Sequence, residues 1–210
     1  MRSKPALQAR SKETRDKIIA ALDRLLERHG FDDITVAQLA AEAGISVGAV
    51  YRRFENKDAL VPVIFDLYRG KLESDFRFEP DVGQGLRAAL RELMVENWRS
   101  MERHGHLLRA VHLLSHQHPE LIGDEWAPIV EASRGGVAAL LDLFKEEIRV
   151  TDREAAVEAV TYFLSSALIE GGLYGEVGLP LAEVLKGERL AEEMADFAAG
   201  YLTLRRAPST

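Results

Sequence analysis

The helical spacing of apolar residues is the feature that most constrains the fold of this chain. Apolar residues recur at i, i+3 and i+4 along most of its length, as at Ile18, Leu22, Leu25 and Leu26. This spacing puts an apolar stripe on a helix, whereas a half-buried strand needs a residue-by-residue alternation, which persists nowhere here. The pattern therefore predicts an all-α protein in which each helix buries one face.

Composition narrows the class of protein further. The 210 residues are 47% hydrophobic and 29% charged, which allows a packed core in one large or two small domains. There is no cysteine, and this excludes disulfide bonds and thiolate chemistry. Because no apolar run is long enough for a signal peptide or a bilayer span, we expect a cytoplasmic protein without membrane contact.

Turn and capping residues predict where the helices begin and end. Gly30 is expected to end the first helix as a C-cap, and Gly135 with Gly136 to loosen a later one. Thr151 with Glu154 is expected to form a capping box. The expected helices are 14–29, 35–43, 46–54, 56–72, 85–103, 106–115, 125–148, 151–174 and 188–206, with frayed ends at 1–9 and 207–210.

The segment from Thr35 to Lys57 has the pattern of a helix-turn-helix. That motif needs a small residue in its first helix, a turn residue that tolerates positive φ, and a branched apolar residue in its second helix. Ala40, Gly44 and Val50 stand at this spacing. The small side chains at positions 46–49 would let the second helix approach a DNA groove closely. Its glycine costs about 1 kcal/mol in a helix, which close approach explains better than stability.

With these residues, the segment resembles the N-terminal DNA-binding domain of TetR-family regulators. The resemblance covers the first quarter to third of the chain and is only architectural beyond it. It implies an all-α fold with an N-terminal helix-turn-helix three-helix domain (1–57) and a C-terminal helical ligand-binding and dimerisation bundle (58–210). The positions that carry the resemblance are Thr14, Ile18, Ala21, Leu25, Gly30, Phe31, Thr35, Leu39, Ala40, 43–46, Gly48, Val50, Tyr51, Phe54, Lys57, Asp58 and Leu60.

The resemblance also implies roles in DNA binding. Thr35, Tyr51 and Lys57 are expected to contact phosphates, although Thr35 could serve only as a helix cap and Tyr51 only as a core aromatic. Arginine pairs well with guanine O6 and N7, and it stays open whether Arg52 or Arg53 reads a base. The expected DNA-binding residues are Thr35, Ser46, Val47, Gly48, Ala49, Tyr51, Arg52, Arg53 and Lys57.

Charge is distributed unevenly along the chain, whose net charge is −7. Positions 1–57 hold 11 Lys and Arg against 8 Asp and Glu, whereas the remainder holds 16 against 26. A mildly basic N-terminal segment followed by an acidic remainder fits a DNA-binding protein with a separate second function. Chance asymmetry is the alternative. Arg10, Lys12 and Arg15 could form an arm along the DNA backbone or a solvated tail.

The last two helices carry faces suited to helix–helix packing. Resemblance to TetR proteins implies that these helices form the interface of a homodimer, which would bring two recognition helices to successive major grooves. The same faces could instead close the core of one monomer. A heptad-like seam is formed by Leu190, Met194, Phe197, Tyr201 and Leu204, and the preceding helix offers Val157, Val160, Leu164, Ala167, Leu168 and Gly171.

Large and adaptable side chains in the middle of the chain are candidates for lining an effector pocket. Ligand sites are mostly apolar, but methionine and aromatic residues at helical spacing also build ordinary cores. Family members bind unrelated molecules, so the small-molecule effector stays unknown. The candidate ligand-binding residues are Met94, Trp98, Met101, His112, Trp126, Phe144 and Phe163.

Five of the six histidines lie between His104 and His118. His112 and His116 have the i, i+4 spacing of metal ligands, but no cysteine or suitably placed carboxylate joins them. We therefore predict no metal site and expect ordinary surface or pocket histidines, of which one could bond a ligand or respond to pH.

Motifs of enzymes are absent from the sequence. It holds no P-loop, no GxSxG elbow and no dinucleotide glycine pattern, so we predict no enzymatic activity and no cofactor. The predicted function is a DNA-binding transcriptional regulator, a ligand-responsive repressor that binds a palindromic operator as a dimer. The alternative is a helical small-molecule-binding protein without operator-specific function.

Overall fold

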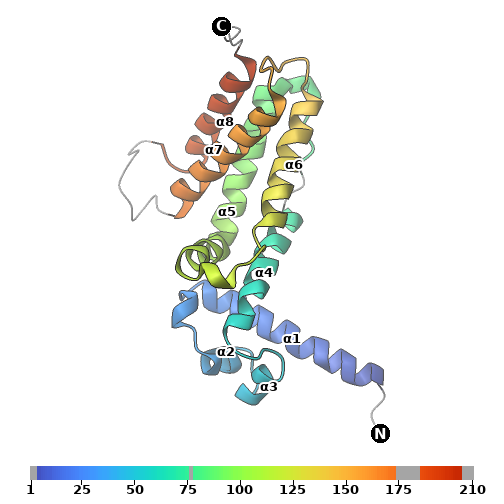
Figure 1. The fold of residues 1–210 in the computed structure, drawn as a ribbon, viewed down its shortest axis with the longest axis vertical. Helices are drawn as coiled ribbons and strands as arrows, with labels where there is room; N and C mark the ends of the chain where they lie inside the picture. The colour runs from blue at the N-terminus through green and yellow to red at the C-terminus, as the bar shows by residue number, and fades with distance from the viewer. Residues whose placement is uncertain (1–3, 76–77, 174–184, 205–210) are drawn as a thin grey trace. The chain divides into compact units, whose positions relative to one another are not determined.

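A computed structural model describes residues 4–75, 78–173 and 185–204 of the chain, with side chains from Ser11 onward. Over these ranges the chain is helical and forms no strand, which confirms the predicted all-α fold. The α-helices are α1 (Lys4–Leu26), α2 (Val36–Glu42), α3 (Val47–Tyr51), α4 (Val61–Asp75), α5 (Gly85–Gln117), α6 (Ala127–Leu143), α7 (Arg153–Leu173) and α8 (Glu188–Thr203) (Figure 1). Short 3-10 turns are η1 (Phe31–Asp33), η2 (Asp58–Leu60), η3 (Val82–Gln84) and η4 (Pro119–Leu121).

The chain divides into two compact units that interleave along the sequence. Unit 1 comprises residues 1–71 and 106–126, and unit 2 comprises residues 72–105 and 127–210. The division falls inside α4 and inside α5, so each of these helices contributes residues to both units. In α5 the backbone leaves helical geometry at His104 (φ −124°, ψ 18°), where the sequence predicts a break. The expected boundary after Lys57 concerns function rather than packing and stays a prediction.

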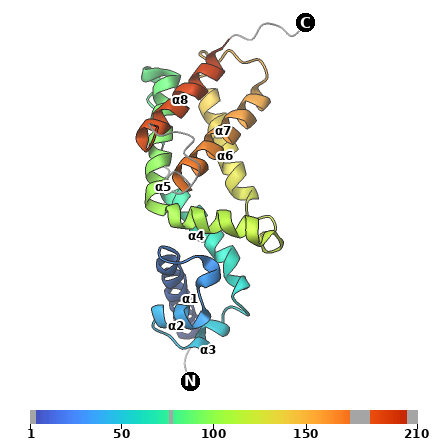
Figure 2. The same cartoon turned by 90° about the vertical axis from the view of Figure 1, so that its left-hand side faces the viewer.

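The core of unit 1 is built on the apolar face of α1. Figure 2 shows α1, α2 and α3 gathered together. Glu42 of α2 accepts bonds from Arg24 of α1 (2.7 Å) and from Arg28, two residues past the end of that helix (3.0 Å). Exposed ion pairs contribute only about 0–1 kcal/mol, so apolar burial is the main force that holds these helices together. The most deeply buried side chains of unit 1 are Ile18, Ala21, Leu22, Leu39, Val50, Leu60, Val61, Ile64, Phe65, Leu107, Val111 and Leu114.

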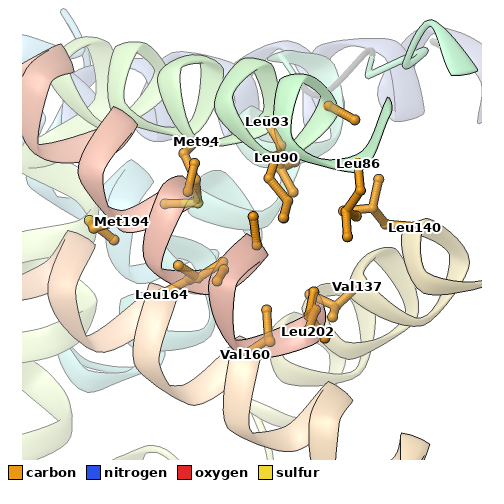
Figure 3. Packing of buried hydrophobic residues seen from close by; sticks show 14 of the residues in the cluster. Leu86, Leu90, Leu93, Met94, Val137, Leu140, Val160, Leu164, Met194 and Leu202 are labelled. Atoms are coloured by element: carbon orange, nitrogen blue, oxygen red, sulfur yellow. The ribbon is translucent and has the colours of Figure 1, made fainter. Parts of the chain in front are cut away.

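The core of unit 2 lies between α6, α7, α8 and the first part of α5. Figure 3 shows the side chains of these helices pointing toward one another. Full burial of one such side chain contributes about 1.5–3 kcal/mol. The labelled residues are Leu86, Leu90, Leu93 and Met94 of α5, Val137 and Leu140 of α6, Val160 and Leu164 of α7, and Met194 and Leu202 of α8.

Gly171 on α7 serves packing within this unit. A Cβ atom at Gly171 would lie 2.5 Å from Cδ2 of Leu190 and 3.4 Å from the ring of Trp98. The absence of a side chain at Gly171 therefore allows helices of one chain to approach each other closely.

Two predictions about the first helix are wrong. The helix begins at Lys4 rather than near Thr14, so the expected frayed head is helical from Lys4 on. Lys12 and Arg15 lie on the exposed surface of this helix, and their contact with DNA stays a prediction. Segment 4–13 lacks an apolar stripe but is rich in strong helix formers, which periodicity alone does not detect. Gly30 is extended (φ −64°, ψ 154°) and follows a helix that already ends at Leu26, so it is not a C-cap.

Two predictions about later helices are also wrong. α6 continues through Gly135 and Gly136, because its opposite side is anchored by side chains such as Leu141, which has no exposed surface. α7 begins at Arg153 and is capped by Asp152, whose Oδ1 accepts a bond from the backbone N–H of Ala155 (3.0 Å), not by the expected box at position 151. The expected helix ends at 174 and 206 lie outside the described residues. No described helix combines the length and apolar character needed to cross a membrane.

Candidate nucleic-acid interface

Thr35 begins the first helix of the helix-turn-helix with a complete capping box. Its hydroxyl accepts a bond from the backbone N–H of Gln38 (3.2 Å) and donates one to Gln38 Oε1 (2.8 Å). The same Oε1 atom accepts a bond from the backbone N–H of Thr35 (2.8 Å). Thr35 therefore does cap a helix, and this box defines the start of α2 through local bonds alone. Thr35 is exposed, and its phosphate contact stays a prediction.

Gly44 forms the turn between α2 and α3. Its φ is +66°, a left-handed conformation that favours glycine. The backbone N–H groups of Gly44 and Ile45 donate to the carbonyls of Ala41 (3.1 Å) and Ala40 (3.0 Å), which satisfies the end of α2. Ala40 and Val50 are almost fully buried, at 2% and 1% exposed. The three positions predicted for a helix-turn-helix thus occupy their expected places.

The short helix α3 has a distinct outer face. Ser46 caps it by accepting a bond from the backbone N–H of Ala49 (3.2 Å). Val47 and Tyr51 are 41% and 52% exposed, so Tyr51 is not a core aromatic. Gly48 is also exposed, whereas Ala49 is buried at 9%. The side chain of Ala49 is therefore turned toward the core, and its expected contact with DNA stays a prediction.

Three basic residues follow in the sequence, Arg52, Arg53 and Lys57, and they differ in the contacts that their side chains make. Arg52 is exposed, and its Nη1 lies 3.8 Å from the position of a Cβ on Gly48. Arg53 instead donates from Nη1 to the hydroxyl of Ser11 on α1 (2.8 Å).

Lys57 also makes contacts inside unit 1. Its ammonium donates to the backbone carbonyl of Asp32 (2.8 Å) and lies 4.6 Å from the centre of the Phe31 ring. The Asp32 carbonyl and the Phe31 ring both belong to η1, which precedes α2. No local sequence pattern indicates the partners of Arg53 and Lys57, because these partners lie 42 and 25 positions away.

Residues 18–64, which include this helix-turn-helix, match the family described as bacterial regulatory proteins, tetR family. Residues 18–64 thus form a DNA-binding domain of the TetR family. An HTH-type transcriptional regulator of Mycobacterium bovis is 28% identical over 191 residues, which cover 90% of this chain and 74% of the relative. One from Haemophilus influenzae is 35% identical over 65 residues, 29% of this chain and 35% of its own length. SrpR of Pseudomonas putida is 36% identical over 75 residues, 36% of this chain and 34% of SrpR.

The chain thus spans about a third of the length of the relatives from Haemophilus and Pseudomonas named above. Solved structures extend the likeness of fold to about nine-tenths of the chain. A TetR transcription regulator from Haloarcula marismortui has a TM-score of 0.69 at 21% identity and covers 91% of this chain and 97% of its own. A TetR-family regulator from Mesorhizobium loti has a TM-score of 0.66 at 18% identity, with 92% and 96% covered. The TetR family consists of DNA-binding transcriptional regulators and not of enzymes.

Four of the seven residues predicted to line an effector pocket lie in or against the core of unit 2. Met94, Trp98 and Phe144 are buried in its core, and Met101 packs against that core. Trp98 donates from Nε1 to Glu102 Oε1 (2.9 Å), so its polar edge is already paired. These four side chains stay candidates for an effector site.

The other three predicted pocket residues lie outside that core. His112 and Trp126 belong to unit 1, where Trp126 donates from Nε1 to the hydroxyl of Ser115 (2.6 Å) and meets the ring of Phe65 edge-on at 5.5 Å. Phe163 is 68% exposed on α7, so we no longer count it among residues of a buried pocket. Helical spacing did not distinguish a core-facing aromatic from an outward one on a helix with apolar residues on several sides.

The predicted seam of α8 divides between the core and the surface. Met194 is buried, and Leu190 and Tyr201 pack against the core of unit 2. Phe197 and Leu204 point outward and are 86% and 61% exposed. On α7, Tyr162 and Phe163 are similarly exposed and form an edge-on ring pair at 5.6 Å. We call these exposed residues, Tyr162, Phe163, Phe197 and Leu204, the outer aromatic face.

The clustered histidines are mostly paired with carboxylates. His104 contacts Asp75 at 3.0 Å, His106 contacts Asp23 at 2.8 Å and His118 contacts Asp32 at 3.2 Å. Within the described ranges, no three side chains of His, Cys, Asp or Glu gather as metal ligands would.

Two of these histidines have perturbed acidity. The bond to Asp32 raises the pKa of His118 above 6.5. Burial lowers the pKa of His112, with a smaller contribution from His116, whose ring centre lies 4.4 Å away. The sequence indicated the cluster but not its partners, which come from distant helices.

Proposed function

We propose that this chain is a ligand-responsive repressor that binds a palindromic operator as a homodimer. The observation that carries the proposal is the exposed outer face of α3, where Val47, Gly48, Tyr51 and Arg52 surround a capped helix start. An exposed tyrosine beside an exposed arginine, on a helix whose inner side is buried, suits contact with phosphates and base edges. Capping bonds within the motif hold this face in a fixed conformation before DNA binds.

The outer aromatic face supports a homodimer. Large apolar side chains that are more than half exposed are costly in water, and a group of them marks a surface for protein contact. A second copy of the chain would cover Phe163 and Phe197, and aromatic residues often anchor such interfaces. The dimer would present two α3 helices to one palindrome.

The interleaved units support a response to a ligand. α4 and α5 each contribute residues to both units, so an effector near Met94 and Trp98 in unit 2 would act on helices that continue into unit 1. A coupling free energy of about 1–3 kcal/mol would weaken operator binding about 5–150-fold. We propose repression, with effector binding as the signal for release.

Titration of the purified full chain with the DNA upstream of its own gene, over a range of salt concentrations, tests this proposal. We expect tight binding to one palindrome, a steep salt dependence, and loss of binding in Tyr51→Ala. Tyr51→Phe separates the role of the hydroxyl from that of the ring, and Lys17→Ala is the control, since Lys17 is exposed on α1 and paired with Glu13.

Two results would contradict parts of the proposal. Binding that stays weak and indifferent to sequence, also in a genome-wide selection, would overturn the operator function. Specific binding that Tyr51→Ala leaves unchanged would overturn the assigned surface.

A further inference from the structure

Two adjacent arginines follow the recognition helix, and their side chains take different directions. Arg53 is half-buried, and its guanidinium donates to Ser11, which lies 42 positions earlier on α1. Arg52 is exposed, and within the described ranges its guanidinium has no hydrogen-bond or ion-pair partner. The sequence alone does not separate them, since both are arginines at neighbouring positions.

The direction of Arg52 follows from helix geometry. Helical side chains point back toward the N-terminus, so a residue at position i covers the surface near i−4. Gly48 is four residues before Arg52, and the Nη1 atom of Arg52 lies 3.8 Å from where a Cβ of Gly48 would be. Because Gly48 has no side chain, the guanidinium lies along the outer face of α3 beside the residues that would enter a groove.

We propose that Arg52 is the residue that reads a guanine in the operator, and that Arg53 is a positioning residue that ties the end of α3 to α1. This inference rests on the proposed DNA-binding function and adds a specificity-determining residue to it. A guanidinium with both of its edge donors available matches guanine O6 and N7 in the major groove. A guanidinium already bonded to Ser11 lacks that freedom, and its role is to hold the helices that present Arg52.

Selection of binding sites from a random DNA library tests the division of roles. The full chain, Arg52→Ala and Arg53→Ala are compared, with Arg52→Lys as the variant that keeps charge but loses the planar fork. We expect the unmodified chain to select a palindrome with a guanine at one symmetric pair of positions. Arg52→Ala should lose that preference, with affinity for the guanine site lower by about 5–150-fold.

The matched variants should behave differently. Arg53→Ala and Ser11→Ala should lower affinity for all sequences alike and leave the base preference unchanged. Replacing the selected guanine by 7-deazaguanine, which lacks the N7 acceptor, should weaken binding of the unmodified chain and leave binding by Arg52→Ala unaffected.

The possible outcomes distinguish the role of Arg52 from the proposed operator-binding function. If the unmodified chain selects no sequence, the proposed operator function fails, and the inference fails with it. If it selects a palindrome whose guanines Arg52→Ala still prefers, only the role of Arg52 is overturned. Loss of one base preference in Arg53→Ala would assign reading to Arg53 instead.

Discussion

The outer face of α3 in unit 1 and the outer aromatic face in unit 2 expose opposite chemistry. Around α3 the exposed residues include the small or polar Ser46 and Gly48 and the basic Arg52, beside Val47 and Tyr51. On α7 and α8 they are large and apolar, with Phe163 and Phe197 at 68% and 86% exposed. A surface of small and basic residues suits contact with the DNA phosphate backbone, whereas an apolar surface suits contact with another protein. The two proposed contact surfaces thus lie on different helices, and substitutions can remove them separately.

The two faces are also built by different means. The caps of Thr35 and Ser46 are bonds over three residues, so the local sequence positions the DNA-facing helices. The outer aromatic face is instead defined by what the core of unit 2 leaves outside, since Met194 packs inward while Phe197 does not. The helices of the first face are also held by buried side chains such as Leu39 and Val50, so this face should depend on the core beneath it. The outer aromatic face should tolerate substitution without loss of fold.

The largest effect is expected from Leu39→Ala, which removes a fully buried side chain of α2, the helix that packs against α3. Leu39 has no exposed surface, and Leu→Ala at such sites costs about 2–5 kcal/mol. Tyr51→Ala, at an exposed position, should change the free energy of unfolding by less than about 0.5 kcal/mol. Urea unfolding of both variants measures the difference. Equal stabilities would show that α3 is not held by this core.

A second substitution, Phe197→Asp, is expected to break the dimer while each chain stays folded. Interface aromatics of this kind contribute about 2 kcal/mol or more, so the dissociation constant should rise at least about 30-fold. Light scattering over a range of protein concentrations measures the change. Glu193→Gln on the same helix, also exposed, is the control. Should Phe197→Asp stay as dimeric as the control, the outer aromatic face does not form the interface.

The first face could be predicted from the sequence to a greater extent than the second. The turn at Gly44 and the cap at Thr35 depend on residue types at fixed short spacing, and such local bonds can be recognised in a single sequence. The partners of Arg53 and Lys57, the inward turn of Ala49 and the exposure of Phe163 depend on how distant segments pack. Spacing along one helix carries no information about that packing.

Helix ends show the same limit. Asp152 and Thr151 are both good capping residues, and which of them caps α7 depends on where the loop from α6 delivers the chain. Segment 4–13 is helical through propensity, although it presents no apolar stripe.

Removing the helix caps should have an intermediate effect in both units. Thr35→Ala and Asp152→Ala each remove an acceptor for an N-terminal amide, at a cost of about 0.5–2 kcal/mol. Asp152→Asn keeps that acceptor and should retain most of the stability. Chemical unfolding measures these losses, and DNA titration should show weaker binding only for Thr35→Ala. Weaker DNA binding by Asp152→Ala as well would contradict a cap effect confined to its own unit.

The smallest effects are expected from pH, and they should differ in direction between the units. In unit 1, Asp32 raises the pKa of His118 above 6.5, so this pair stabilises the fold fully below that pH and less as the pH rises through the raised value. In unit 2, Arg87 and Arg91 hold the pKa of Asp196 well below 3.8. Its stabilising effect is complete above that pH and fades as the pH falls through the lowered value.

Thermal unfolding of His118→Gln and Asp196→Asn at several pH values tests this difference. The destabilisation by His118→Gln should be present in mildly acidic buffer and vanish in alkaline buffer, because neutral imidazole no longer attracts Asp32. The destabilisation by Asp196→Asn should persist at neutral and alkaline pH and shrink only in strong acid. Both pairs are exposed to solvent, so added salt should reduce both effects. A destabilisation by His118→Gln that grows with rising pH would show that this histidine acts in its neutral form, through packing and not through its charge.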